Sequence, residues 1–176
     1  MWGTKMRFTV YLAAAAATLA VATPAVAQQA SANALAKGVV VQPLTLAKVQ
    51  DLDFGTVVGS AASGNVVIDA DTGGRTVGGG VTGVPSFPGD RGLFTGAGTS
   101  GQTVVLSLSA PAVLVSQSNP LDTITVTSMG LDSGGLTRVI GASGIFQVGV
   151  GGNFAIAANQ PAALYQATFT LTADYQ

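Results

Sequence analysis

The chain has 176 residues, of which 48% are apolar and only 9% are charged, and its formal net charge is -1. It contains 24 glycines but no cysteine, histidine or glutamate, so all eight acidic residues are Asp. These absences exclude Ser-His-Asp and Cys-His catalysis, thiolate metal sites and disulfide bonds. The charge balance provides no basic surface for nucleic acid. We therefore expect neither an enzyme nor a nucleic-acid-binding protein, and no cofactor or metal site.

Residues 1–27 have the three-part pattern of a secretory signal peptide. Lys5 and Arg7 form a short positive region, an apolar run follows from Phe8 to Ala22, and an Ala-x-Ala site ends at Ala27. The apolar run is shorter than the roughly 20 residues that span a bilayer as a helix. The pattern predicts cleavage after Ala27 and export through the periplasm. The mature protein is then expected to be secreted or held at the cell surface, as in Gram-negative cells.

The mature chain is predicted to be all-β. Short runs rich in Val, Thr, Ile and Phe are separated by turns rich in Gly, Asn, Asp and Pro, a pattern typical of a one-domain β-sandwich or barrel. The expected strands are 39–41, 44–49, 52–58, 66–68, 103–108, 124–127, 145–150 and 154–157. The expected turns are 69–74, 78–80, 85–92, 119–120, 133–135 and 151–153.

The last twelve residues have the clearest strand pattern. Apolar and polar side chains alternate without a break, so the apolar ones are expected to share one face of a strand that runs to the final residue. The six apolar residues are Tyr165, Ala167, Phe169, Leu171, Ala173 and Tyr175. Such a strand leaves an edge beside which another chain can pair. The simpler interpretation is an ordinary strand of a closed sandwich.

Three motifs between residues 39 and 176 resemble those of chaperone–usher pilins and, more narrowly, of the related DUF4402 family. They are Pro43–Leu46 followed by Asp51–Val58 with a Leu-x-Phe-Gly core, then Val67–Asp69 followed by Thr72–Arg75, and finally Asn159–Pro161 leading into the alternating strand. The resemblance implies an immunoglobulin-like β-sandwich that lacks its final strand. A periplasmic chaperone first fills the open groove and pairs with the C-terminal strand, and a neighbouring subunit's N-terminal extension then replaces it.

The same resemblance implies a function. It predicts an exported structural subunit of a surface pilus, or fimbrium, that assembles by donor-strand exchange and takes part in cell adhesion. The implied partners are identical or related subunits, the periplasmic chaperone, an outer-membrane usher and a surface receptor. A second hypothesis is a monomeric secreted β-sandwich that binds carbohydrate or another surface ligand, with its first strand folded into its own sheet.

Residues 28–42 are expected to form a flexible N-terminal extension, a candidate donor strand ahead of a pilin-like domain over 43–176. Resembling donor strands alternate apolar residues around one Gly. The register Ala36, Gly38 and Val40, with Leu44 beyond the proline, fits this pattern. A second register buries Leu35, Val39 and Val41 but places Lys37 in the groove, where an unpaired charge is costly. The sequence leaves both registers open. The expected subunit and chaperone interface comprises Ala36, Gly38, Val40, Leu44, Tyr165, Ala167, Phe169, Leu171, Ala173 and Tyr175.

Two aspartate pairs are the remaining candidates for chemistry. Asp51 and Asp53 share a strand face and are expected to point to solvent rather than across a glycosidase cleft. Asp69 and Asp71 lie in an Asp-x-Asp-x-Gly turn that partly resembles a calcium loop, but no Glu is available to complete the EF-hand pattern. We interpret this pair as turn residues and leave calcium binding open.

Two further glycine- or proline-rich stretches are interpreted structurally. Residues 82–94 are expected to form a long loop, with Phe87 and Phe94 either anchored to the core or facing a partner. The glycine runs at 78–80 and 149–152 lack the Lys-Ser/Thr ending of a phosphate-binding loop. They are predicted to be turns or bulges.

Overall fold

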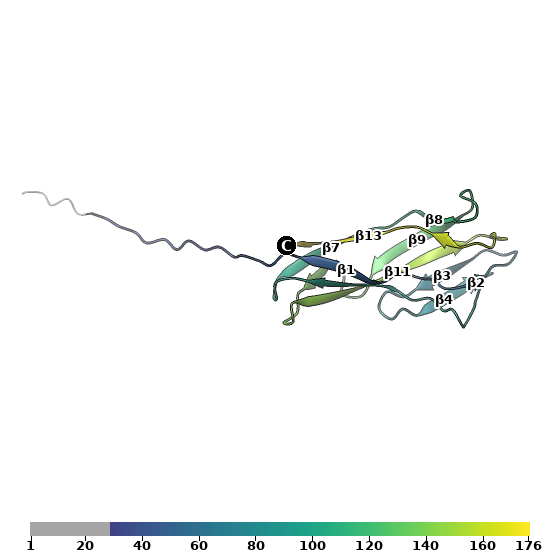
Figure 1. Ribbon diagram of the computed structural model, residues 1–176, viewed down its shortest axis with the longest axis horizontal. Coiled ribbons are helices and arrows are strands. Elements are labelled where there is room, and N and C mark those ends of the chain that lie inside the picture. The colour runs from purple at the N-terminus through teal and green to yellow at the C-terminus, as the bar shows by residue number, and fades with distance from the viewer. Residues whose placement is uncertain (1–28) are drawn as a thin grey trace, which may run out of the picture. The chain divides into compact units, whose positions relative to one another are not determined.

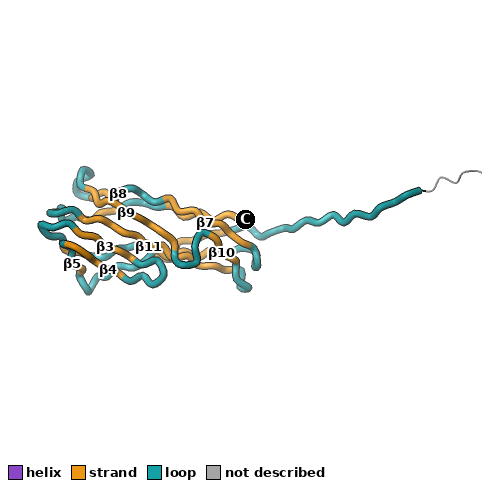
Figure 2. Tube along the Cα trace, turned by 180° about the vertical axis from the view of Figure 1, so that it is seen from behind, coloured by secondary structure: helices purple, strands orange, loops and turns teal. Residues whose placement is uncertain are grey.

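The computed structural model describes residues 29–176, so the expected signal peptide and its cleavage site lie outside the described residues. Val39–Gln176 forms one compact unit. Figures 1 and 2 show that this unit consists of strands and loops, and no residue from 29 to 176 is helical. Accordingly, that part of the chain has no helix with the length and apolar character needed to cross a membrane. Gln29–Gly38 is exposed and has no regular secondary structure.

Thirteen strands are present within the described range. They are β1 (Thr45–Gln50), β2 (Val57–Val58), β3 (Gly64–Ile68), β4 (Arg75–Gly79), β5 (Thr82–Gly83), β6 (Gly92–Ala97), β7 (Thr103–Ser109), β8 (Val113–Ser116), β9 (Thr123–Leu131), β10 (Thr137–Val139), β11 (Ile145–Ile156), β12 (Tyr165–Gln166) and β13 (Thr170–Tyr175).

These strands form three antiparallel sheets. The largest has eight strands in the order β1-β6-β11-β9-β8-β12, with β3 paired to β11 and β4 paired to β3. A second sheet has the order β10-β7-β13, and β2 pairs with β5 in the third. The predicted all-β class is confirmed, and the layered antiparallel sheets are consistent with the predicted β-sandwich.

Two apolar clusters form the core. The first lies between the eight-stranded and three-stranded sheets and includes Phe94 and Val148 from one sheet and Leu106 and Leu171 from the other. The second contains side chains of β3, β8, β9, β11 and β12. At its margin the ring of Phe54 stacks on Phe154 with 4.8 Å between ring centroids.

The strand predictions succeed at four short runs rich in apolar and β-branched residues. The predicted strands at 44–49, 66–68, 103–108 and 124–127 correspond to β1, β3, β7 and β9. The strand predicted at 39–41 is wrong, because these residues have no ladder partner in the structure. Of the strand predicted at 52–58, only Val57–Val58 pairs regularly, since the left-handed Gly55 bends the chain. The sequence pattern did not predict β4, β5, β6, β8 and β10.

The turn predicted at 151–153 is also wrong, because β11 continues through it from Ile145 to Ile156. The glycines serve close packing instead. A Cβ on Gly149 would collide with the carbonyl oxygen of Ala70, and a Cβ on Gly151 would lie 2.6 Å from the Ala70 nitrogen. Bare glycines therefore allow the 69–74 turn to cross directly over this strand.

The predicted twelve-residue last strand is divided between two sheets. Tyr165–Gln166 pairs with β8, whereas Thr170–Tyr175 pairs with β7. Ala167–Phe169 forms no strand and carries the chain from one sheet to the other. The alternation still predicts most of the burial: Tyr165 and Leu171 are buried and Phe169, Ala173 and Tyr175 half-buried, but Ala167 is exposed.

Candidate strand-binding site

Two sheet edges face the same side of the sandwich without pairing. β1 pairs only with β6, and β13 pairs only with β7. Figure 1 shows β1 and β13 running along the same side of the domain. Within residues 29–176, no backbone hydrogen bond joins these two strands. Both edges therefore retain backbone N–H and C=O groups that can pair with another strand.

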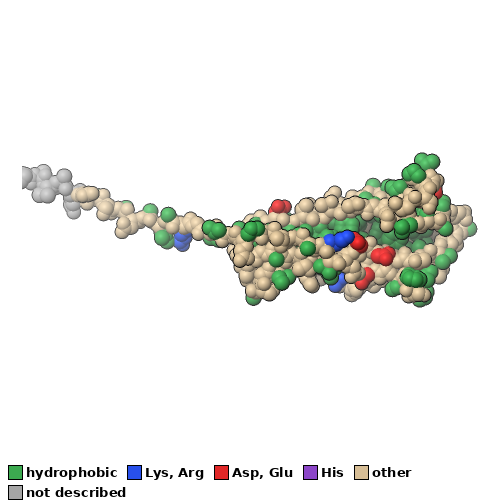
Figure 3. Space-filling view, viewed as in Figure 1, with side chains coloured by type: hydrophobic (Ala, Val, Ile, Leu, Met, Phe, Trp, Pro, Cys, Tyr) green, Lys and Arg blue, Asp and Glu red, His purple; other side chains and the backbone are tan. Residues whose placement is uncertain are grey.

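Apolar side chains lie between these edges. Leu46 of β1, Leu52 just after it and Phe169 just before β13 are half-buried against the core clusters. A Cβ on Gly92 would lie 3.4 Å from both Leu52 Cβ and Phe169 Cζ, so this glycine forms the floor between them. Phe169 meets Phe94 edge to face, with 5.8 Å between ring centroids. Figure 3 shows the resulting apolar band between the two edges, which we call the β1–β13 opening.

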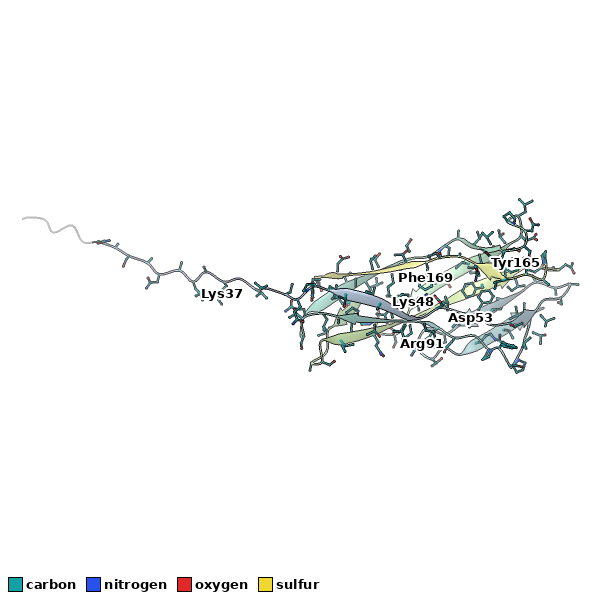
Figure 4. All side chains as sticks on the ribbon, in the orientation of Figure 1. Lys37, Lys48, Asp53, Arg91, Tyr165 and Phe169 are labelled. Carbon is teal, nitrogen blue, oxygen red and sulfur yellow. The ribbon has the colours of Figure 1, made fainter. Side chains whose placement is uncertain are left out.

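One charged residue occupies the core-facing row of β1. Lys48 lies directly opposite the buried Phe94 in the β1–β6 ladder, two residues after the half-buried Leu46. Directly opposed residues share a face of the sheet, so the side chain of Lys48 leaves β1 on the face that carries Phe94. Its side chain is nevertheless 55% exposed, and its Nζ lies 2.6 Å from Asp51 Oδ1. Figure 4 shows Lys48 on β1 and Phe169 near the start of β13. An inward charge on an edge strand opposes unspecific pairing.

The segment before β1 is fixed at Gln42. Its backbone N–H donates to Thr99 Oγ1 at 2.7 Å, and the Tyr175 hydroxyl donates to its carbonyl oxygen at 2.8 Å. The same hydroxyl accepts the Thr99 N–H at 2.8 Å. Just before this clamp, Val39, Val40 and Val41 are 81%, 97% and 38% exposed. A β-prone apolar run therefore lies in solvent at the beginning of the domain.

The structure places the predicted interface residues in two groups. Leu44 packs half-buried against the first core cluster, and the residues predicted in the last strand lie along β12, β13 and the crossing between them. Ala36, Gly38 and Val40 are exposed and belong to no strand. Lys48 and the hydroxyl of Tyr175 were not predicted from the sequence as parts of this site. Lys48 could have been found, because it continues the inward alternation of Leu44 and Leu46.

The predicted loop at 82–94 is shorter in the structure, since β5 and β6 occupy its ends. Arg75 holds the intervening segment: its guanidinium donates to the carbonyl oxygens of Thr56 at 3.0 Å, Phe87 at 3.0 Å and Val84 at 2.9 Å. Phe94 is buried in the core, whereas Phe87 remains 62% exposed. The loop thus presents one aromatic ring to solvent on a backbone held by Arg75.

A shallow pocket lies beside that ring. It is lined by Gln50, Asp51, Asp53, Ser86, Phe87, Pro88, Gly89 and Asp90. Asp53 and Asp90 exchange backbone hydrogen bonds at 2.9 and 2.7 Å, which join the loop to the segment after β1. The Gln50 side chain and the Arg91 N–H, both of which hydrogen-bond its carboxylate, lower the pKa of Asp90.

The second aspartate pair stabilises loops. Asp69 Oδ1 accepts from the Thr72 hydroxyl at 2.8 Å and from the backbone N–H groups of Thr72 and Asp71 at 2.7 and 3.0 Å. These bonds, led by the one from the hydroxyl, lower the pKa of Asp69. Hydrogen bonding from Ser133, first from its side chain and then from its backbone N–H, which lies 2.8 Å from Asp71 Oδ1, lowers the pKa of Asp71. The predicted turn at 69–74 is present. Between residues 29 and 176, no group of three or more acidic side chains is placed to hold a metal ion.

The geometry defines a class of protein, an all-β domain with two unpaired sheet edges beside an apolar band. Within that class, the chain belongs to the DUF4402 family, which is described as a domain of unknown function and whose model matches residues 44–175. The resemblance to this family is therefore confirmed, and the matched range contains every strand from β1 to β13. No curated protein and no solved structure matches the chain.

Proposed function

We propose that this protein is an exported structural subunit of a surface pilus or filament that assembles by donor-strand exchange and takes part in adhesion. In this proposal, the exposed segment before β1 of one copy pairs in the β1–β13 opening of another. A periplasmic chaperone covers the same opening before assembly, and an outer-membrane usher exports the subunits. The finer relationship to chaperone–usher pilins is part of the proposal.

The observation that carries the proposal is the coexistence of an exposed, β-prone segment that pairs with no sheet and two sheet edges that lack a neighbouring strand. Val39–Val41 is β-branched, apolar and exposed, whereas β1 and β13 each have one ladder neighbour. Addition of this segment as a strand would bury its apolar side chains and would pair the free backbone groups of the two edges. Main-chain hydrogen bonds would supply affinity, and alternate side chains would enter the apolar band. The clamp at Gln42 supports an exchange between copies, since it fixes where this segment leaves its own domain.

A charge substitution in the valine run tests the proposal. Val40→Asp, combined with Val39→Asp, alters side chains that are 97% and 81% exposed, so the folded domain should keep its melting temperature. In either register one of the two carboxylates would face inward, and burying it between copies is costly. We therefore expect the variant to remain monomeric by light scattering after periplasmic expression with the cognate chaperone, where the parent chain forms filaments.

The matched control introduces the same two charges further upstream, as Ser31→Asp with Asn33→Asp. Both positions are exposed and lie outside the expected inward registers. The control should assemble like the parent. Assembly of the valine variant to the same extent as the control, or a parent that never assembles when supplied with its chaperone, would contradict the proposal.

A second candidate function has its own observation. The exposed Phe87 ring beside the carboxylates of Asp51, Asp53 and Asp90 is an arrangement on which a sugar ring can stack while its hydroxyls donate to the carboxylates. A monomeric domain that binds carbohydrate would use this pocket. Glycan-array binding that Phe87→Ala abolishes, by a chain that stays monomeric with its chaperone, would favour this function over the first.

A further inference from the structure

The β1–β13 opening contains a charge that any incoming strand must meet. Lys48 sits on the core-facing row of β1, opposite Phe94, and its side chain is 55% exposed because nothing in its own domain covers it there. Asp51 provides one carboxylate within 2.6 Å of its Nζ. A strand that adds beside β1 would place its own inward side chains on the same face as Lys48.

We propose that Lys48 sets the register of the incoming strand from a second copy, so that Ala36, Gly38 and Val40 face inward and Gly38 lies beside Lys48. This inference rests on the proposed function. It assigns Lys48 a specificity role that distinguishes between the two registers left open by the sequence. Lys48 acts here as a positioning residue and takes part in no chemical step.

Charge disfavours the other register. If Leu35, Val39 and Val41 faced inward, Lys37 would join the same row as Lys48. Two ammonium groups would then share an apolar opening, where like charges on adjacent strands repel. Lys37 is the one charged residue in the described segment before β1. In the proposed register its side chain points outward to solvent instead.

Space favours the proposed register. The four-carbon stem of Lys48 needs room beside it if the ammonium is to stay hydrated when a strand covers the opening. Glycine supplies that room, since it has no side chain. The φ of Gly38 lies outside the left-handed region. Backbone conformation therefore does not require a glycine there, whereas the proposed contact does.

Disulfide trapping between copies tests the register, and the chain has no native cysteine to interfere. Leu46→Cys places a reporter on the core-facing row while keeping Lys48. It is mixed with chains that carry one cysteine in the segment before β1 and is then oxidised. Neighbouring strands bring same-face residues within disulfide range. With Gly38 beside Lys48, Val40→Cys should trap a dimer if the two strands run antiparallel, and Ala36→Cys should do so if they run parallel. Leu35→Cys, Lys37→Cys and Val39→Cys should not.

Two further variants make the result decisive. The reporter Ala47→Cys lies on the opposite face of β1 and is exposed, so it should reverse the pattern even if Leu46→Cys weakens the domain. Lys48→Glu should shift trapping by Leu46→Cys toward the register in which Lys37 faces inward, because the Lys37 ammonium could then pair with the introduced carboxylate. Two results would overturn the inference while leaving strand exchange intact. One is a trapping pattern that Lys48→Glu does not change. The other is preferential trapping, in chains that keep Lys48, of the register in which Lys37 faces inward. Absence of assembly in the cysteine-free parent would overturn the proposed function itself.

Discussion

The hydrogen bonds made by Arg75 allow the stability loss of an Arg75→Ala variant to be predicted from the structure. The guanidinium donates to the backbone carbonyls of Thr56, Val84 and Phe87 at 2.9 to 3.0 Å, and to that of Phe54 at 3.4 Å. Two glycines make room for it, because a Cβ on Gly55 or Gly83 would lie within 2.6 Å of a guanidinium nitrogen. Arg75→Ala removes the three short bonds and the longer one to Phe54, and leaves the loop that carries Phe87 held by backbone hydrogen bonds.

The expected cost follows from the number of bonds. Hydrogen bonds that involve a charged group contribute about 1.5–3 kcal/mol each, but carbonyls in a partly exposed loop regain water after truncation, so we use about 1 kcal/mol per bond. The variant should therefore lose about 3 kcal/mol of unfolding free energy. For a domain of this size that loss lowers the melting temperature by about 6–12 °C. Arg75→Lys should recover only part of the loss, since a single ammonium cannot reproduce the planar fork.

Calorimetry and urea unfolding of monomeric protein measure the effect. Thr76→Ser, at an exposed position in the same strand, serves as the control and should change stability by less than about 0.5 kcal/mol. An Arg75→Ala variant that melts within about 2 °C of the parent, where about 3 kcal/mol predicts a larger shift, would refute the role assigned to these hydrogen bonds. So would an Arg75→Lys variant that is as stable as the parent.

Two further predictions concern other parts of the domain. Gly151→Ala places a Cβ against the backbone of Ile68 and Ala70 and should cost about 1–3 kcal/mol in urea unfolding. Its ladder partner Gly130, where a Cβ would meet no atom within 4 Å, should accept Ala without loss, and equal effects at the two sites would contradict the packing argument. Asp69 has a pKa below its ordinary value of 3.8, so its contribution to stability is present above that value and is lost as the pH falls through the folded-state pKa. Asp69→Asn should therefore lose less stability than the parent between pH 5 and pH 3, and equal acid sensitivity of the two proteins would count against this role.

The sequence predicted the elements whose local pattern agrees with their tertiary role. Alternation located β1, β7 and β9, a short apolar run between turns located β3, and the alternation of the last twelve residues predicted the burial of Tyr165 and Leu171. It failed where glycine occurs within strands. In β6, Gly92 and Gly96 are buried in the core-facing row, so the usual apolar signal is absent there. In β11, Gly149 and Gly151 suggested a turn, although they allow a distant loop to cross the strand.

The candidate site was less predictable than the fold, because it depends on which edges remain unpaired. The alternation over residues 165–176 was real, but it could not reveal the change of sheet at Ala167–Phe169 that places β13 at an edge. The role proposed for Lys48 depends on its position opposite Phe94, which a ladder register defines and a sequence does not. Tyr175 likewise meets Gln42 across 133 positions of sequence. The two registers of the segment before β1 could be stated from sequence, whereas a reason to choose between them required the structure.

Amide hydrogen exchange tests the central claim most directly, since it reports which backbone groups an added strand covers. The full chain is examined as a monomer, and again after addition of a peptide that spans residues 34–42. The account predicts that the peptide slows exchange along β1 and β13, which have unpaired edges, and leaves β9 and β11, which are already paired on both sides, unchanged. A Gly38→Leu peptide should protect neither edge. Unchanged exchange at both β1 and β13 with the parent peptide at saturating concentration would contradict the account.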